Sequence, residues 1–370
     1  MSQVKLNRPL KTVVAWMTVI SLSVIGCAKE RDVEHVINNQ LRVKKTDLLG
    51  TYSFLKTMTR VSYPGREFGG LPAGYYLDND KLVQLVIKEN SLDIVSIDPL
   101  FQDAKDARAN STLASFPIEH VDILRKQNVD NEDTHEEEET NTRRVWNERE
   151  YIKIDVTEDN LSPFKKATVF ASPSEKGVQI DRSAGAINIV VTRHLNDDTE
   201  IDVRYSLLKF ENNETYSQKE YSKELQKQFG FFKSTTYQFD QYGRITTKTV
   251  KDFANRWDTS KPVTFYLSKN FPEHLIPVVK QVFENWNYGF RQSVGHDVLK
   301  LEPNSGQEMG DLRYSMITYV DDQDAAHRIL GYGPSYTNPR TGEIIKADVV
   351  LFGGTLRRSL FSERVWEILL

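Results

Sequence analysis

Cysteine is almost absent from this chain, since its 370 residues contain one, Cys27. A single cysteine cannot form a disulfide within the chain, so packing rather than cross-linking must stabilise the fold. After residue 26, no apolar run approaches the length of a membrane-spanning helix. An excess of positive charge is also missing: 48 basic and 52 acidic residues give a net charge of -4. Nothing in this balance indicates nucleic-acid binding.

Cys27 ends a segment with the features of a bacterial lipoprotein signal. An apolar stretch, Val13–Ile25, is too short for an ordinary spanning helix, and the small residue Gly26 precedes the cysteine. The basic residues before it are Lys5, Arg8 and Lys11. This order predicts a signal peptide over residues 1–26 and a lipid anchor on Cys27. The alternative is a lone buried cysteine behind a short membrane anchor.

The residues after Cys27 indicate where the anchored protein resides. Ala28, rather than an aspartate, follows the cysteine, which favours the outer membrane over retention at the inner one. Residues 27–49 are largely polar and charged, and we expect them to form a tether. The sequence thus predicts a lipid-anchored protein of the cell envelope whose membrane partner is reached through Cys27.

The next part of the chain has the pattern of β structure. Residues 50–129 predict a β-rich domain, in which apolar runs at 82–87 and 92–97 flank a polar connection suited to a hairpin. Residues 130–144 predict an acidic linker, because 130–139 contain no apolar residue. A calcium or metal site in this stretch is the alternative, but it lacks the spacing and turn glycine of a calcium loop.

A second β-rich domain is predicted over residues 145–257. Residues 151–156 and 201–205 alternate apolar and polar side chains, as do the apolar positions Ile187, Ile189 and Val191. A period of two residues is typical of half-buried strands. We therefore expect an antiparallel accessory domain here.

Residues 258–370 combine helix and sheet, which suggests a separate module. A strand is predicted at 262–268, a leading turn at 273–275, and a helix from about Pro277 that Gly295 ends. Two further strands are predicted at 298–301 and 312–320. The helix carries one apolar stripe that predicts a core face, made of Val279, Val282, Phe283, Trp286 and Phe290. The overall fold class expected is α+β.

Four sequence blocks in this module carry a family resemblance. They are Phe283–Phe290, Gly310–Ile317, Gly333–Ser335 and Asn338–Asp348. In this order and spacing the chain resembles bacterial zinc-dependent metalloproteases of metzincin type that carry a β-rich domain ahead of the catalytic module. The resemblance covers roughly residues 187–370, weakly at 229–232 and 256–257 and strongly from 262. It implies that residues 258–370 form the sheet-and-helix half of such a module.

The block Asn338–Asp348 can also be interpreted from its residues alone. Asn338 and Pro339 begin a turn, Gly342 can supply a positive φ, and apolar residues at 345, 347, 349 and 351 then alternate along a strand that ends at 353–354. A plain hairpin in a sheet explains this pattern. In the family that the chain resembles, the matching strand lines the cleft as a sheet edge, where an extended peptide adds by main-chain hydrogen bonds. The resemblance thus implies a substrate-binding edge formed by Ala347, Asp348, Val349, Val350 and Leu351.

Zinc is the cofactor that the resemblance implies, but this sequence contains no H-E-x-x-H motif. That motif places two imidazoles on one helix face, and its glutamate activates the metal-bound water. No two of the seven histidines are four residues apart; they are His35, His120, His135, His194, His274, His296 and His327. Zinc bound by scattered histidines is an alternative without a helix-borne pair, and a lone histidine is more often structural. No catalytic or metal-binding residue is therefore assigned.

These features predict the N-terminal portion of an exported zinc-dependent metalloprotease lipoprotein. The chain ends in an apolar-rich helical run, 361–370, and we expect it to stop before the catalytic helix, through truncation or separate encoding, and to be inactive alone. Whether it acts as an enzyme stays open. The alternative is a non-catalytic outer-membrane lipoprotein that binds a peptide or protein, and in both cases a peptide or protein is the expected partner besides the membrane.

Overall fold

A computed structural model describes most of the chain after residue 40. It covers residues 41–62, 73–97, 110–127, 133–140, 144–156, 177–194, 200–222, 232–237, 250–321 and 329–357, with single positions between 240 and 246. Cys27, the signal peptide, His327 and the run 361–370 lie outside the described residues. The chain divides into two compact units, of which the larger comprises Ile37–Val121 and Arg143–Leu370.

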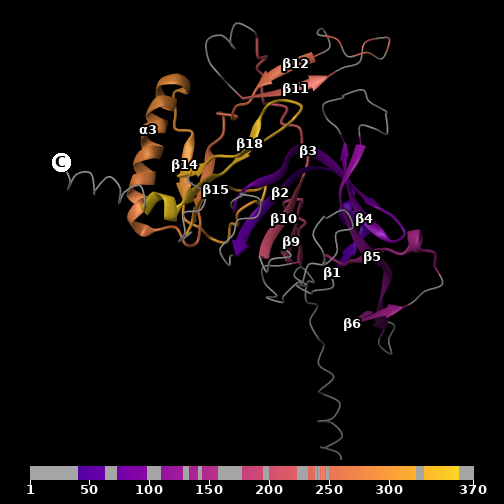
Figure 1. Cartoon of the computed structure of the whole chain (residues 1–370). Coiled ribbons are helices and arrows are strands. Elements are labelled where there is room, and N and C mark those ends of the chain that lie inside the picture. The colour runs from indigo at the N-terminus through magenta and orange to yellow at the C-terminus, as the bar shows by residue number, and fades with distance from the viewer. Residues whose placement is uncertain are drawn as a thin grey trace, which may run out of the picture. The chain divides into compact units, whose positions relative to one another are not determined.

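A curled antiparallel sheet dominates the larger unit (Figure 1). Its nine strands follow the spatial order β1 (Leu41–Lys44), β7 (Tyr151–Ile154), β5 (Asn110–Gln127, with Val121 the last residue in this unit), β4 (Ser91–Ile97), β3 (Tyr76–Ile87), β2 (Thr51–Ser62), β10 (Glu200–Lys209), β9 (Ala186–His194) and β8 (Gly177–Asp181). The hairpin predicted around residues 88–91 is confirmed, because β3 and β4 pair from Ile87 with Leu92 to Leu82 with Ile97. The end of the predicted tether forms β1 and a 3-10 turn, η1 (Lys45–Leu48), whose Leu48 is buried.

Strands from the two β-rich domains expected from the sequence lie in this one sheet. Strand β2, from residues 50–129, pairs with β10, from residues 145–257, along nearly the whole length of both. The acidic stretch expected as a linker contains a strand, β6 (Asp133–Thr140). In the smaller unit, β6 pairs antiparallel with residues Asp122–Gln127 of β5. Backbone pairing requires N–H and C=O groups but no apolar side chains, so a polar composition alone does not exclude a strand.

One face of the curled sheet holds the main hydrophobic core. Phe54, Phe116 and Tyr205 meet there, with the Phe116 and Tyr205 rings edge to face at 5.4 Å. The strand predicted at 201–205 is confirmed, but it is buried on both faces rather than half-buried, because every residue from Ile201 to Leu207 is buried. The second face of β10 and β2 is covered as well, since Leu55 of β2 packs in a further cluster with Leu312.

The C-terminal module contains a five-stranded mixed sheet. Its order is β14 (Leu299–Glu302), β13 (Val263–Leu267), β15 (Ser315–Val320), β19 (Val349–Phe352) and β16 (Gly331–Tyr332). The first four strands are parallel, and β16 runs antiparallel to β19. Two hairpins accompany this sheet: β11 (Lys233–Tyr237) with β12 (Val250–Ala254), and β17 (Ser335–Thr337) with β18 (Ile344–Ala347). The described chain is mostly β-sheet with few helices, which is broadly compatible with the expected α+β class.

Helix α3 (Ile276–Val294) connects the parallel strands β13 and β14. The turn η4 (Glu273–Leu275) precedes it and Gly295, with φ of 84°, ends it, so these predictions are confirmed. A further short 3-10 turn, η3 (Trp146–Glu148), precedes β7. Among the described helices, none is long and apolar enough to cross a membrane.

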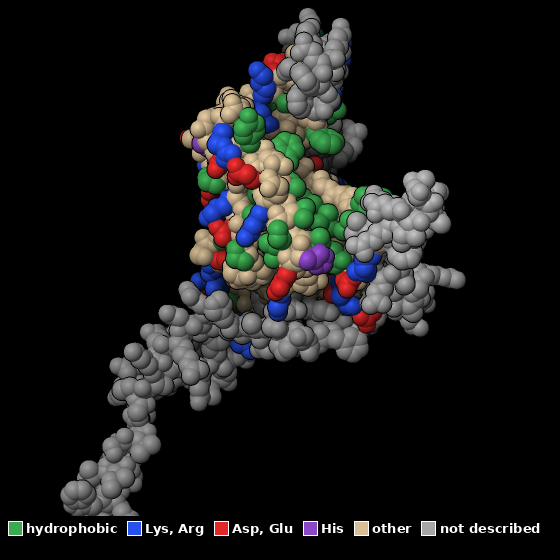
Figure 2. Space-filling view, turned by 90° about the vertical axis from the view of Figure 1, so that its left-hand side faces the viewer, with side chains coloured by type: hydrophobic (Ala, Val, Ile, Leu, Met, Phe, Trp, Pro, Cys, Tyr) green, Lys and Arg blue, Asp and Glu red, His purple; other side chains and the backbone are tan. Residues whose placement is uncertain are grey.

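The core face of α3 differs from the predicted stripe. Val279, Phe283 and Phe290 pack on the second core, and Phe283 meets the ring of Phe265 edge to face at 5.7 Å. Val282 and Trp286 are 46% and 62% exposed, so placing these two in the core is wrong. Figure 2 faces this side of the molecule and shows apolar side chains scattered among charged ones.

The true inward face of α3 includes a polar residue. Asn287 is buried, its amide donates to the carbonyl of Leu299, and its oxygen accepts from the backbone N–H groups of Val298 and Leu299. Hydrogen bonds to the start of β14 compensate the burial of this amide. Hydrophobicity alone could not identify this position as part of the core face.

Candidate functional site

The sequence blocks Gly310–Ile317 and Asn338–Asp348 meet on the outer face of the curled sheet. Gly310 has a φ of 81°, and a Cβ added there would lie 2.8 Å from the Cβ of Thr57 on β2. Both facts favour glycine, because L side chains rarely adopt this φ and no atom fits in that space. Glycine at position 310 therefore allows the next residue, Asp311, to lie directly against the curled sheet.

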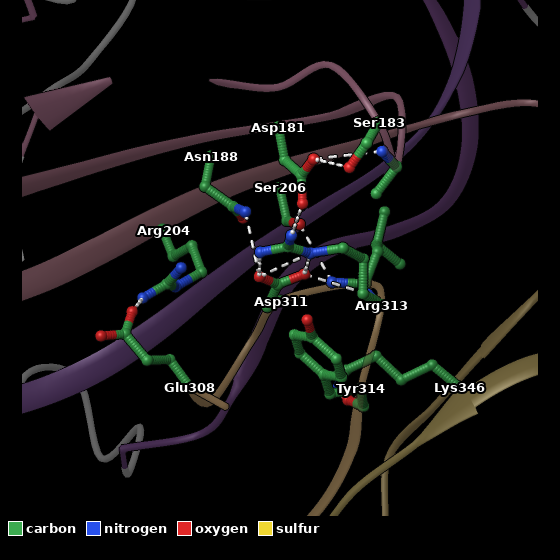
Figure 3. A network of polar contacts seen from close by, with 12 residues as sticks. Asp181, Ser183, Asn188, Arg204, Ser206, Glu308, Asp311, Arg313, Tyr314 and Lys346 are labelled. Carbon is green, nitrogen blue, oxygen red and sulfur yellow. Dashed lines mark hydrogen bonds and ion pairs between the residues drawn. The ribbon is translucent and has the colours of Figure 1, made fainter. Parts of the chain in front are cut away.

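Asp311 is the centre of a buried polar network (Figure 3). Its Oδ2 lies 2.6 Å from Nη2 of Arg313 and accepts from Asn188 of β9 at 3.0 Å. Arg313 also pairs with Asp181 of β8 at 2.7 Å. Burial would raise the pKa of Asp311, but the hydrogen bonds and charge of Arg313 outweigh it and hold the pKa below its ordinary value. Asp311 is therefore a carboxylate that links β9 directly, and β8 through Arg313, to the C-terminal module.

Lys346 and Asp348 form a second buried group, with their side chains fully inaccessible. Nζ of Lys346 lies 2.6 Å from Oδ1 of Asp348 and also donates to the carbonyl of Tyr314. The N–H of Met316 donates to Oδ1 of Asp348 at 2.9 Å, and the hydroxyl of Tyr76 donates to Oδ2 at 2.8 Å. Burial, reinforced by the charge of Asp348, raises the pKa of Tyr76, so its hydroxyl keeps its proton.

Both groups have the chemistry of a docking contact. The carboxylates of Asp311 and Asp348 accept hydrogen bonds from the curled sheet on one side and from their own module on the other. Each carboxylate thus contacts both layers through buried hydrogen bonds, which compensate the burial of its charge. Asp311 and Asp348 belong to the sequence blocks of the family resemblance, but the sequence alone did not predict that they join the C-terminal module to the curled sheet. The available signal was the spacing of Lys346 and Asp348, since opposite charges two residues apart in an extended segment can face the same side.

The predicted substrate-binding edge falls across two strands. β18 ends at Ala347 and β19 begins at Val349, so the expectation of one continuous strand over 345–351 is wrong. Asp348 lies between the strands, where its N–H donates to the carbonyl of Pro334. The apolar alternation is misleading here, because the most buried positions are Lys346, Asp348 and Val350 rather than the odd-numbered ones.

The outer neighbour of β19 is β16. Gly331 pairs with Leu351 and Tyr332 with Val350. The predicted edge residues of β19 thus have β15 on one side and β16 on the other over this length. Other details of the same block are confirmed: Gly342 has a φ of 75°, and its N–H donates to the carbonyl of Asn338 at 2.9 Å to close the turn.

Two of the described histidines, His120 and His296, lie beside backbone carbonyls. His120 is buried against the ring of Trp146, its Nε2 lies 2.9 Å from the carbonyl of Lys88, and burial lowers its pKa. Nε2 of the exposed His296 lies 2.8 Å from the carbonyl of Thr259. Within the part of the chain that the structure describes, no three His, Cys, Asp or Glu side chains form a group that could hold a metal ion.

Comparison with known proteins gives no assignment. No family model, no curated protein and no solved structure matches the chain. Any inference about function must therefore be drawn from the residues of this chain and their geometry.

Proposed function

We propose that this chain is the front portion of an exported zinc-dependent metalloprotease lipoprotein, and that its C-terminal module supplies the sheet along which an extended peptide binds. The observation that carries the proposal is the strand order β14-β13-β15-β19-β16, in which the short antiparallel strand β16 is outermost. The four sequence blocks that resemble metzincins belong to this sheet, its helix or the segments beside it. The support is thus a module of mixed helix and sheet at the place where the resemblance is strongest.

The peptide-binding role belongs to the outer edge of this sheet. The segment from Leu330 to Pro334 runs beside β19, with hydrogen bonds from the N–H groups of Phe352 and Asp348 to its two ends. A sheet edge offers main-chain donors and acceptors to an added strand, which gives affinity without requiring a particular side chain. We therefore assign peptide addition to β16 rather than to residues 347–351 themselves.

Zinc chemistry is not assigned to this chain. The resemblance places the zinc ligands on a later helix that carries H-E-x-x-H, and that motif is absent from the 370 residues. The bound zinc would activate water and polarise the scissile carbonyl in the complete module. We expect the isolated chain to cleave no peptide in a zinc-dependent way. Stoichiometric zinc together with chelator-sensitive cleavage of casein would contradict this.

The proposal is tested by sequencing the genomic DNA that encodes residue 370 and several hundred bases beyond it. A downstream segment that encodes H-E-x-x-H, in frame or one frameshift away, is the expected result. Joining that segment to this chain should then give chelator-sensitive casein cleavage. Unrelated downstream sequence would instead favour the alternative, a non-catalytic lipoprotein that binds a peptide or protein.

The envelope location is a separate part of the proposal. It depends on acylation of Cys27, so Cys27→Ser should move the protein from the detergent phase to the aqueous phase in a phase-separation assay. A variant that partitions like the parent would show that Cys27 does not carry the anchor.

A further inference from the structure

A cavity of about 480 Å³ lies at the carboxyl ends of β13 and β15. Residues just after or at the end of these strands line one side, Ser268 after β13 and Val320 in β15, while Arg60 of β2 and Arg204 of β10 line the other. Cavities of this size accommodate small molecules, and the carboxyl ends of parallel strands are a frequent place for ligands. Nothing in the metalloprotease proposal uses this cavity.

The period of the strands explains which side chains reach the cavity. Along β15, Ile317 and Tyr319 belong to the core shared with α3, so Met316 and Thr318 face the opposite side, toward the cavity. Along β10, Val203 belongs to the core within the curl, so its neighbours on the strand face outward. The cavity therefore lies between the outer face of the curled sheet and the face of the five-stranded sheet that is opposite α3.

Arg204 is the central charged group of this cavity. Its side chain is only 5% exposed, and its Nη2 forms an ion pair with Glu308. Its Nε and Nη1 are buried and have no hydrogen-bond partner among the described residues. Thr318, which also lines the cavity and is 7% exposed, has a hydroxyl that lacks a partner in the same part of the chain. Buried donors are normally satisfied, so two such groups around one cavity indicate an acceptor supplied from outside.

The other charges indicate what kind of acceptor fits. Arg60 is bound to Asp202 at 2.6 Å, and Asp321 is bound to Arg357 at 2.8 Å. With Glu308, three carboxylates line the cavity, and the cations Arg60, Arg204 and Lys269 balance them, so the lining has no net positive charge to offset a doubly charged anion. A single negative charge with oxygen acceptors suits the remaining donors of the Arg204 guanidinium.

We propose that this cavity binds a small organic carboxylate, whose oxygens accept hydrogen bonds from Arg204 and Thr318. Its short apolar part packs against Met309 and Met316, which line the same cavity. Glu308, which lines the same cavity, pairs with Nη2 of the guanidinium and so fixes its orientation for the ligand. This site is independent of the peptide edge at β16.

Binding is tested on the full chain in detergent with sodium butyrate as the probe, by isothermal titration calorimetry at constant ionic strength. We expect saturable binding of butyrate at one site. Arg204→Lys keeps the charge beside Glu308 but removes the additional donors, so it should weaken binding at least tenfold. Thr318→Val keeps the shape of the side chain and should also weaken binding, by about threefold to tenfold. Arg182→Lys, at an exposed ion pair with Asp47 away from the cavity, is the matched control and should bind like the parent.

Specific outcomes would overturn the proposal. These are no saturable heat from butyrate in the parent, equal binding by Thr318→Val and the parent, or equal binding by Arg204→Lys and the parent. Inorganic phosphate serves as the second probe, and tighter binding of phosphate than of butyrate would also overturn it. Far-UV circular dichroism checks that both variants fold, and Thr318→Val provides the decisive comparison if Arg204→Lys does not.

Discussion

The side chains of Lys346 and Asp348 are fully buried and form an ion pair. Removing one member of a buried pair leaves the other charge without compensation, which typically costs several kcal/mol. Lys346→Met should therefore lower the free energy of unfolding by about 3 kcal/mol, because Asp348 would retain only the Met316 N–H and the Tyr76 hydroxyl as donors. Urea denaturation followed by circular dichroism measures this loss.

The double variant Lys346→Met with Asp348→Leu is the matched comparison for that experiment. It removes both charges, so we expect it to be more stable than Lys346→Met alone. A double variant less stable than the single one would mean that the hydrogen bonds to Asp348, rather than the pairing of charges, stabilise this region.

Asp80 makes the stability of the fold depend on pH. It has a φ of 54°, and its Oδ1 accepts from the N–H of Thr337 at 2.5 Å. Burial raises the pKa of Asp80 from 3.8 to about 6, although the hydrogen bond from Thr337 opposes the shift. Between these two values the folded state binds a proton that the unfolded state does not. Stability from this residue is therefore present below pH 4 and is lost as the pH rises through about 6.

Asp80→Asn tests this pH dependence. Asparagine tolerates the same backbone conformation, and its amide oxygen can accept from Thr337 without carrying a charge. Relative to the parent, the variant should gain roughly 2 to 2.5 kcal/mol of unfolding free energy between pH 4 and pH 7. The measurement is the difference in unfolding free energy between the variant and the parent at each pH. This difference is needed because other carboxylates, such as Asp258 and Asp311, have lowered pKa values and make stability rise with pH in both proteins. A difference that does not vary with pH would contradict the assignment.

At the scale of the elements, two glycine variants can separate the cost of overpacking between the Gly310 turn and β2 from the cost of backbone strain. Gly310 and Gly295 have nearly the same φ, 81° and 84°, but a Cβ at Gly310 would lie 2.8 Å from Thr57, whereas nothing lies within 4 Å at Gly295. Gly295→Ala should cost about 1 kcal/mol of unfolding free energy, from strain alone. Gly310→Ala should cost about 2 to 4 kcal/mol because it adds overpacking. Equal losses in thermal or urea unfolding would show that the turn can move away from β2.

Local signals in the sequence predicted several elements well. The turn η4, the start of α3 beside Pro277 and its end at Gly295 follow from proline and glycine chemistry, which acts within a few residues. The hairpin of β3 and β4 and the positive φ of Gly342 were predictable for the same reason. Each of these features is specified by residues adjacent in the chain.

Features that depend on distant partners could not be predicted in this way. Val282 and Trp286 share the helical period of Phe283, but only the position of the sheet decides which of them is covered. The burial of Lys346 and Asp348 requires partners from β3 and from the segment before β15, which no local pattern reveals. The candidate carboxylate cavity has the same origin, because its walls come from strands more than 100 residues apart.

At the scale of the whole molecule, the sequence and the structure lead to different expectations for how the larger compact unit unfolds. Two β-rich domains and a separate C-terminal module should unfold in steps. In the structure, β10 pairs with β2, and the buried Tyr336 hydroxyl donates to the carbonyl of Lys81 while accepting from the N–H of Phe54. Contacts of this kind join the curled sheet to the C-terminal module through buried surface, so neither is expected to unfold alone.

Tryptophan fluorescence can report on the two regions separately. Trp146 lies beside His120 at the curled sheet, and Trp257 packs on Phe265 at the second core. Two variants that each keep one of these tryptophans and replace the other four by phenylalanine should show the same urea midpoint. Leu312→Ala, at a buried position where the two layers meet, should lower both midpoints together, by about 2 to 4 kcal/mol in unfolding free energy. Two separate midpoints, or a loss confined to Trp257, would mean that the curled sheet is stable without the module packed on it, and residues 258–370 would then behave as the independent module that their sequence suggests.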